Sequence, residues 1–205
     1  MTIAKSPQSK RQLKKQFKSF EDYLATDPSD LPEGRHEYWH EELVPVMSES
    51  GFNALLANCL FLALANAGVP AAILRPHSCE VEVSGMPRTR FPDLTVLAEE
   101  HIALIERRER ITRDMPPPRL LVEVVSPGDE NSENYQRDYV QKARQYADIL
   151  VPEYWIIDPS RAVVLVGLLV NGEYKFQSFT GHQKIVSPTF PAVSLTAKQI
   201  LMRSI

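Results

Sequence analysis

The strand–helix–strand unit in the second half of the chain constrains the fold more than any other feature. Residues 119–125, RLLVEVV, form a nearly continuous apolar run, which is typical of a central strand covered on both faces. Residues 133–148 predict a helix, and EYWIID at 153–158 predicts a second strand. Four side chains recur on one face of that helix, at i, i+4, i+7 and i+11: Tyr135, Tyr139, Lys142 and Tyr146. This order of elements implies parallel neighbouring strands joined by a right-handed crossover.

Shorter elements are expected around this unit. Helices are predicted over Phe20–Ala25, over 52–66 with a stop at Gly68, over 99–110 before three consecutive prolines, and from Thr196. Further strands are predicted at 70–74, 79–83, 89–97 and near 192–194, with a hairpin turn at Asn171-Gly172. The segment 34–47, GRHEYWHEELVPVM, fits either a hairpin or a helical turn. The pattern predicts a single α/β domain with a mixed central sheet flanked by helices.

The run from Ser50 to Leu74 has 25 residues without a charge, which is long enough to raise the question of a membrane span. Polar and helix-breaking residues interrupt it: Asn53, Asn58, Asn66, Gly68 and Pro70. Each amide would need a hydrogen-bond partner that lipid does not provide. We therefore interpret this run as a buried helix and expect no membrane association.

The 205 residues suffice for one domain with its own core, without disulfide or metal staples. The formal charge of −3 and the pI near 6.0 do not fit a strongly basic nucleic-acid binder, although a local basic strip remains compatible with them. Cys59 and Cys79 stand far apart, so we expect reduced thiols and a cytoplasmic location. Residues 1–19 hold several basic residues and no acid, and we interpret them as a basic, flexible tail ahead of a domain over 20–205.

Two carboxylates interrupt apolar strands. Glu123 lies within RLLVEVV, and Asp93 lies in RFPDLTVL just after Pro92. A charge in such a position costs several kcal/mol unless it is paired, protonated or bound to a cation. If the two strands are neighbours, the acids form a pocket that suits Mg²⁺, which prefers oxygen ligands and retains waters. The alternative for each acid is a structural salt bridge to a core-facing Arg or Lys.

Lys142 is a candidate cation for this pocket because it shares the helix face that should pack on the sheet. Asp138 precedes it by four residues, and the simpler interpretation of the two is an exposed helical ion pair worth about 0.3–0.5 kcal/mol. Both interpretations stay open at this point.

Three segments in this order, FPDLTVL, LLVEVVSPG and RDYVQKARQYADILVPEYWIIDP, resemble the Uma-type restriction endonuclease family of the PD-(D/E)XK nuclease superfamily. The resemblance runs from about Phe20 to Leu201 and implies a restriction-endonuclease-like fold. It also implies an endonuclease that hydrolyses phosphodiester bonds of nucleic acid, with DNA as the expected substrate, and Mg²⁺ as cofactor with Mn²⁺ as a substitute.

The resemblance further implies site residues. Asp93, Glu123 and the main-chain carbonyl of Val124 would hold the metal, and Lys142 would be the catalytic lysine. The superfamily usually places this lysine two residues after the second acid, where this chain has Val125, so the lysine would have moved to the following helix. Glu37 falls where the family often has another acid, and Glu37 and Asp138 are therefore possible auxiliary residues.

The residues His36-Glu37-Tyr38-Trp39-His40 spell HExxH, the zinc metalloprotease signature, in which one helix face presents both imidazoles. The context is poor, because Gly34 precedes the motif and an aromatic pair lies within it. A zinc metallohydrolase is thus a weaker alternative. A second alternative is a nuclease fold that binds nucleic acid or a protein without cutting. A homodimer is compatible with double-strand cleavage, while the choice between DNA and RNA and the sequence specificity stay open.

Overall fold

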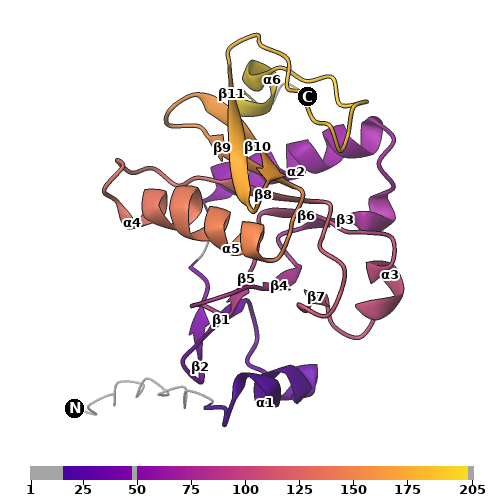
Figure 1. Ribbon diagram of the computed structural model, residues 1–205, viewed down its shortest axis with the longest axis vertical. Helices are drawn as coiled ribbons and strands as arrows, with labels where there is room; N and C mark the ends of the chain where they lie inside the picture. The colour runs from indigo at the N-terminus through magenta and orange to yellow at the C-terminus, as the bar shows by residue number, and fades with distance from the viewer. Residues whose placement is uncertain (1–15, 48–49, 203–205) are drawn as a thin grey trace, which may run out of the picture.

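A mixed six-stranded sheet forms the centre of the molecule in the computed structural model, which describes residues 16–47 and 50–202 (Figure 1). Its strand order is β11-β10-β9-β8-β6-β3. The strands are β3 (Leu74–Pro76), β6 (Leu94–Val96), β8 (Leu120–Val124), β9 (Glu153–Asp158), β10 (Val163–Val170) and β11 (Glu173–Thr180). β8 and β9 pair in parallel, and the other neighbours pair antiparallel. The predicted α/β class with a mixed sheet is confirmed.

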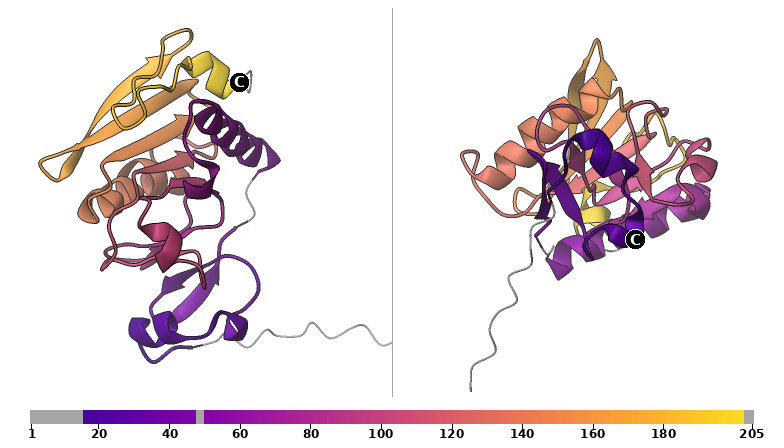
Figure 2. Two further views of the ribbon diagram at one scale, coloured as in Figure 1. Left: turned by 90° about the vertical axis from the view of Figure 1, so that its right-hand side faces the viewer. Right: turned by 90° about the horizontal axis from the view of Figure 1, so that it is seen from below.

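Helices cover both faces of this sheet. α2 (Gly51–Asn66) lies on one face, and the helix made of α4 (Glu133–Tyr135), a π-helical segment η3 (Gln136–Gln141) and α5 (Lys142–Asp148) lies on the other (Figures 1 and 2). Every residue of β8 and β9 is buried, which explains why both strands are apolar on their two faces. Three further short helices complete this part of the fold: η2 (Ala71–Ile73), α3 (His101–Leu104) and α6 (Ala197–Leu201). Of these, α6 contacts α2.

The N-terminal elements form a smaller unit together with a second, three-stranded sheet. It contains α1 (Phe20–Ala25), η1 (Pro28–Asp30), the hairpin of β1 (His36–Trp39) and β2 (Glu42–Pro45), and a three-stranded sheet of β5 (Thr89–Arg90), β4 (Glu80–Glu82) and β7 (Arg110–Ile111). Its apolar cluster is separate from the main core and consists of Phe17, Phe20, Tyr23, Tyr38 and Leu43. Two hydrophobic clusters thus lie within one chain, and the β1–β2 hairpin contributes Tyr38 and Leu43 to the smaller one.

A buried ion network holds the smaller unit together. The Glu80 carboxylate accepts hydrogen bonds from Arg110 Nε at 2.6 Å, from Arg108 Nη2 at 2.9 Å and from the Tyr23 hydroxyl. The guanidinium carbons of Arg108 and Arg110 lie 4.8 and 4.3 Å from the centre of the Tyr23 ring. These contacts tie α1 to β4 and β7 across large distances in sequence.

Several predicted elements are confirmed. α1 spans the predicted residues, α2 and β9 match their ranges closely, and the helix predicted at 133–148 is present. The turn between β10 and β11 is Asn171-Gly172, with φ of 53° and 83°, as the primed hairpin turns require. The ambiguous segment 34–47 is a hairpin.

Four predicted elements are wrong. Residues 71–73 form one 3₁₀ turn, and the strand starts only at Leu74. The run 89–97 splits at Pro92, which has no N–H for a ladder bond, so β5 and β6 join different sheets. The helix predicted over 99–110 ends at Leu104, because the chain beyond it turns to bring Arg108 and Arg110 to Glu80. Residues 192–194 form no strand. Isolated backbone hydrogen bonds hold the chain next to them, such as the bond from Ile185 N–H to Leu195 O at 2.8 Å.

Most of the tail predicted over residues 1–19 lies outside the described residues, which begin at Gln16. Phe17 is buried in the smaller cluster, and its N–H bonds Glu41 O at 2.9 Å. The packed part of the chain therefore starts slightly before the predicted boundary at Phe20. Within residues 16–47 and 50–202, no helix combines the length and apolar character that a bilayer crossing requires.

Candidate functional site

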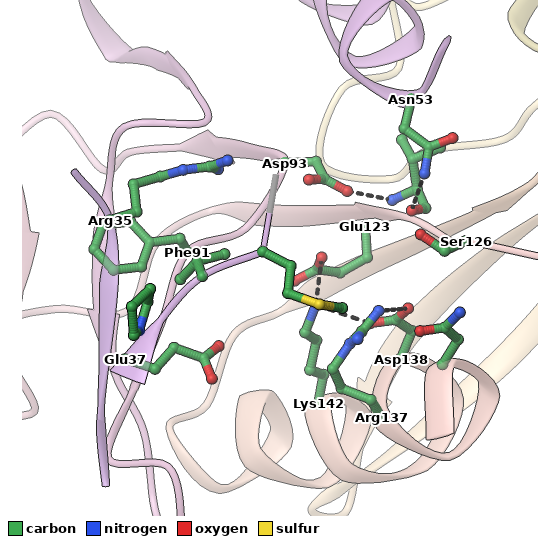
Figure 3. Close-up of a pocket in the computed structure, with 15 residues that line it drawn as sticks. Arg35, Glu37, Asn53, Phe91, Asp93, Glu123, Ser126, Arg137, Asp138 and Lys142 are labelled. Carbon is green, nitrogen blue, oxygen red and sulfur yellow. Dashed lines mark hydrogen bonds and ion pairs between the residues drawn. The ribbon is translucent and has the colours of Figure 1, made fainter. Parts of the chain in front are cut away.

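A cavity of about 280 Å³ lies between the β1–β2 hairpin and the end of β8. Its walls come from distant parts of the chain: the hairpin, the start of α2, the residues ahead of β6, the end of β8 and the η3 segment. Charged side chains that line it are Arg35, Glu37, Asp93, Glu123, Arg137, Asp138 and Lys142 (Figure 3). All the side chains predicted as site residues therefore reach the same cavity.

Asp93 is held at the cavity by the sheet. Its N–H donates to Val122 O at 3.0 Å, which extends the β6–β8 pairing by one residue. Its Oδ2 accepts from the N–H of Val124 at 2.6 Å, and Oδ1 lies 3.9 Å from Nδ1 of His77. The antiparallel pairing of β6 with β8 thus places the two acids of the predicted pair on adjacent strands.

Lys142 joins two carboxylates inside the cavity. Its Nζ lies 2.7 Å from Glu123 Oε2 and 2.8 Å from Asp138 Oδ1, and Lys142 is 7% exposed. Asp138 is 1% exposed, so the Asp138–Lys142 pair is buried, and its interpretation as an exposed helical pair is wrong. The helix that follows β8 delivers this ammonium to the acids, while Val125, where the superfamily usually has its lysine, packs in the core.

Glu123 and Asp138 each accept further hydrogen bonds from a second side chain. Tyr146 donates its hydroxyl proton to Glu123 Oε1 at 2.6 Å. The guanidinium of Arg137 donates to both oxygens of Asp138, each at 3.0 Å. Arg137 and Lys142 therefore bind the same carboxylate (Figure 3).

The environment shifts the pKa values of these groups in different directions. Burial raises the pKa of Glu123, and the Lys142 ammonium opposes this shift. Burial of the Asp138 carboxyl disfavours its charge, but Lys142 and Arg137 outweigh this effect and hold its pKa below the usual range. Burial of Lys142 disfavours the ammonium, but the carboxylates of Asp138 and Glu123 outweigh it and raise the pKa of Lys142. These carboxylates thus favour the charged ammonium form of Lys142.

The cavity presents oxygen groups of the kind that a hard divalent cation binds. Asp93, Glu123 and the Val124 carbonyl line the cavity together, and the carbonyl accepts one hydrogen bond from Asn53 Nδ2 at 3.2 Å, which leaves its second lone pair for another partner. Among the residues with described positions, no group of three or more His, Cys, Asp or Glu side chains could hold a metal ion. A ligand set of two carboxylates and one carbonyl suits Mg²⁺, which keeps several of its waters.

Glu37 reaches the cavity from β1. Both of its carboxylate oxygens accept from Arg90 Nη1, at 3.2 and 3.3 Å. Arg90 is buried and also donates from Nε to Gln145 Oε1 at 2.9 Å. Glu37 therefore lines the cavity, and Arg90 balances its charge.

The HExxH interpretation is wrong. Residues 36–39 form strand β1, in which successive side chains alternate between the two faces, and His40 lies in the turn with φ of 39°. His36 Nδ1 lies 3.2 Å from Gly34 O. A strand and a turn cannot present the two imidazoles as one helix face does, so the zinc alternative loses its geometric basis.

Sequence reasoning missed Asn53, Arg35 and Arg137 as residues of this site. The sequence does contain a signal for Asn53, because a polar amide within an uncharged, apolar helix needs a hydrogen-bond partner if it is buried. In the structure Asn53 is 4% exposed, and its partner is Val124 O. The two arginines had no such signal, because both occur in polar segments where arginine is ordinary.

The comparisons with known proteins agree with this architecture. A solved structure described as a putative nuclease belonging to DUF820, from Anabaena variabilis, matches with a TM-score of 0.62 and 17% sequence identity. The match covers 90% of this chain and 98% of the other, and at this identity it shows a shared fold. Comparison with curated protein sequences gave no match. The family model Uma2, described as a putative restriction endonuclease, matches residues 20–198.

The Uma2 match spans the central sheet, both helix layers and every charged residue that lines the cavity. It also contains the three segments whose order suggested the resemblance. On this evidence the chain belongs to the Uma2 family of restriction-endonuclease-like proteins.

Proposed function

We propose that this protein is a metal-dependent endonuclease that hydrolyses phosphodiester bonds in DNA. The observation that carries the proposal is the position of the Lys142 ammonium, which lies between Glu123 and Asp138 in the cavity that Asp93 also lines. A buried cation held by one acid near the end of a central strand and by a second acid on the following helix, in a family described as restriction endonucleases, supports phosphodiester chemistry.

The reaction requires positive charge. Attack on a phosphodiester gives a transition state with more negative charge than the ground state, and fixed cations stabilise it. The Lys142 ammonium can orient the attacking water or stabilise a developing oxyanion. Asp138 holds this ammonium in place, and Arg137 holds Asp138.

Asp93, Glu123 and the Val124 carbonyl would hold Mg²⁺, with Mn²⁺ as a substitute. When bound, such an ion supplies an acidified water and neutralises charge on the phosphate. The hydrogen bonds from Val124 N–H to Asp93 and from Asn53 to Val124 O keep these oxygen ligands oriented. Arg35 and Arg137, on different walls of the cavity, could contact the phosphates on either side of the scissile bond.

Cleavage of supercoiled plasmid DNA with Mg²⁺ or Mn²⁺ tests the proposal. The wild-type protein should convert the supercoiled plasmid to relaxed or linear DNA, and EDTA should stop the reaction by removing the metal ion. Asp93→Asn and Lys142→Gln should abolish cleavage. Lys175→Gln and Glu173→Gln are matched controls, because these residues form an exposed ion pair at 3.5 Å on β11 and should retain cleavage.

Each variant is checked for folding by circular dichroism. Cleavage that survives in a folded Asp93→Asn variant would contradict the proposed site. Binding of DNA by the wild type without any cleavage would favour the non-catalytic binding module instead. Parallel assays with single-stranded DNA and with RNA define the substrate.

A further inference from the structure

Two tyrosine rings stack on each other at the start of the helix that follows β8. The ring centres of Tyr135 and Tyr139 lie 4.1 Å apart, and the ring planes differ by 11°. Both residues are partly exposed. The guanidinium carbon of Arg161 lies 4.9 Å from the centre of the Tyr135 ring and 5.8 Å from the centre of the Tyr139 ring. We call Tyr135, Tyr139 and Arg161 the tyrosine platform.

A buried carboxylate fixes two members of the tyrosine platform. Asp158, the last residue of β9, is 0% exposed. Its Oδ2 accepts from the Tyr139 hydroxyl at 2.8 Å and from Arg161 Nη1 at 2.8 Å. Arg161 Nη2 also donates to Gly128 O at 3.1 Å, which ties the loop after β8 to the same group. The platform is therefore ordered before a ligand arrives, which lowers the entropy cost of binding.

The tyrosine platform leaves one ring face without a partner among its own members. If Arg161 covered the face of Tyr135 that points away from Tyr139, the Tyr135 ring would lie between them, and Arg161 would be much farther than 5.8 Å from the Tyr139 ring centre. Arg161 therefore lies at the edge of the stack. A partly exposed tyrosine face of this kind stacks the flat bases of single-stranded nucleic acid.

The tyrosine platform lies at the same edge of the sheet as the cavity. β8 and β9 run parallel, and Val124 pairs with Ile157, so the carboxyl ends of the two strands adjoin. Asn134 and Arg137, which flank Tyr135 on the helix, both line the cavity (Figure 3). Two helical positions correspond to about 3 Å along the axis, which is close to the spacing of successive nucleotides, about 3.4 Å. A strand with one phosphate in the cavity can thus reach the platform with a neighbouring nucleotide.

We propose that Tyr135 stacks an unpaired base of the strand whose phosphate lies in the cavity, an inference that rests on the proposed nuclease function. A base reaches such a ring only after it has left the duplex stack, and this costs least where the base is already unpaired. The substrate class is therefore single-stranded DNA or DNA with locally unpaired bases.

Arg161 adds a contact for the backbone of the same strand. Its side chain is 31% exposed, and a guanidinium has further N–H donors besides those that bind Asp158 and Gly128. These donors suit a phosphate oxygen beside the stacked base. The platform thus combines a ring face for a base with a cation for a phosphate, as sites for single-stranded nucleic acid do.

Equilibrium binding to two labelled strands of equal length tests the proposal. One strand is oligodeoxythymidylate, and the other has the same sugars and phosphates but no bases. Fluorescence anisotropy with the full chain in EDTA excludes cleavage. The wild type should bind the thymidine strand about tenfold more tightly or better than the abasic strand. Tyr135→Ala should remove this preference without changing the affinity for the abasic strand, and Tyr135→Phe should keep the preference.

Val140→Ala is the matched control, because it shortens a 50% exposed apolar side chain on the same helix and should keep the wild-type preference. Circular dichroism checks that each variant folds. The wild-type comparison needs no variant, and equal binding of both strands by the wild type would overturn the proposal. A folded Tyr135→Ala that keeps the preference, or that weakens binding of both strands equally, would also overturn it and leave the stack a purely structural role.

These results are separate from those of the plasmid assay. A wild type that prefers the thymidine strand but cuts no plasmid would retain the base-stacking site and lose the nuclease proposal. A wild type that cuts plasmid but shows no preference between the two strands would lose only the base-stacking site.

Discussion

At the scale of single residues, Lys142 has two roles that compete in any mutational test. Its ammonium neutralises Glu123 and Asp138, which are 2% and 1% exposed. Removing one partner of a buried ion pair typically costs about 3–5 kcal/mol, because the other charge stays buried without compensation. We expect Lys142→Met to lower the free energy of unfolding by about this amount, measured by urea denaturation.

The double variant Lys142→Met/Glu123→Gln tests the cause of this loss. It removes one of the two carboxylates, and the amide oxygen introduced at position 123 could still accept from Tyr146, so part of the lost stability should return. A double variant no more stable than Lys142→Met would show that the loss has another origin.

His101 should make stability depend on pH. It is 0% exposed, its Nδ1 accepts from the Ala98 N–H at 3.1 Å, and its Nε2 lies 2.7 Å from Pro116 O. Nδ1 can accept only when it carries no proton, and burial lowers the pKa of His101. The unfolded state therefore binds the proton at higher pH than the folded state, and stability from this residue falls as pH drops below about 6.5.

His101→Gln isolates this contribution. Near neutral pH the variant should be less stable than the wild type, and the difference in free energy of unfolding should shrink as the pH is lowered toward about 5. Chemical denaturation at several pH values measures the difference. A gap that is constant over this range would contradict the role of a neutral His101.

At the scale of elements, the helix after β8 shows what periodicity can and cannot predict. Its spacing correctly indicated that Lys142 and Tyr146 share the buried face. It did not indicate the π-helical turn over Gln136–Gln141, which changes the phase ahead of Lys142. Asp138 is buried within that turn, so its place in the site depends on local geometry that the spacing does not record.

The β1–β2 hairpin supports a prediction about zinc. Because His36 and His40 lie on a strand and in a turn, His36→Ala and His40→Ala should retain nuclease activity in the plasmid assay. Glu37→Gln should lower it more than either, because Glu37 lines the cavity. Loss of activity in both histidine variants, with stoichiometric zinc in the purified protein, would reverse this conclusion.

At the scale of the whole molecule, the cavity lies where the smaller unit meets the central sheet. Arg35 and Glu37 come from the hairpin, while Asp93, Glu123 and Lys142 come from the sheet and its helix. The Glu37–Arg90 ion pair spans 53 residues of sequence and closes one wall. The docking of the two hydrophobic clusters therefore shapes the site.

The sequence by itself determined the central strands, the parallel unit around the helix, and the candidates Asp93, Glu123 and Lys142. These inferences depend on local facts: a charge within an apolar strand is costly wherever it lies, and helix spacing places Lys142 on the buried face. Only the tertiary structure decided that residues 36–39 form a strand, that 89–97 divides between two sheets, and that Asp138 and Arg137 join Lys142. Those outcomes depend on partners distant in sequence or on the phase of one helical turn, and a local pattern contains neither.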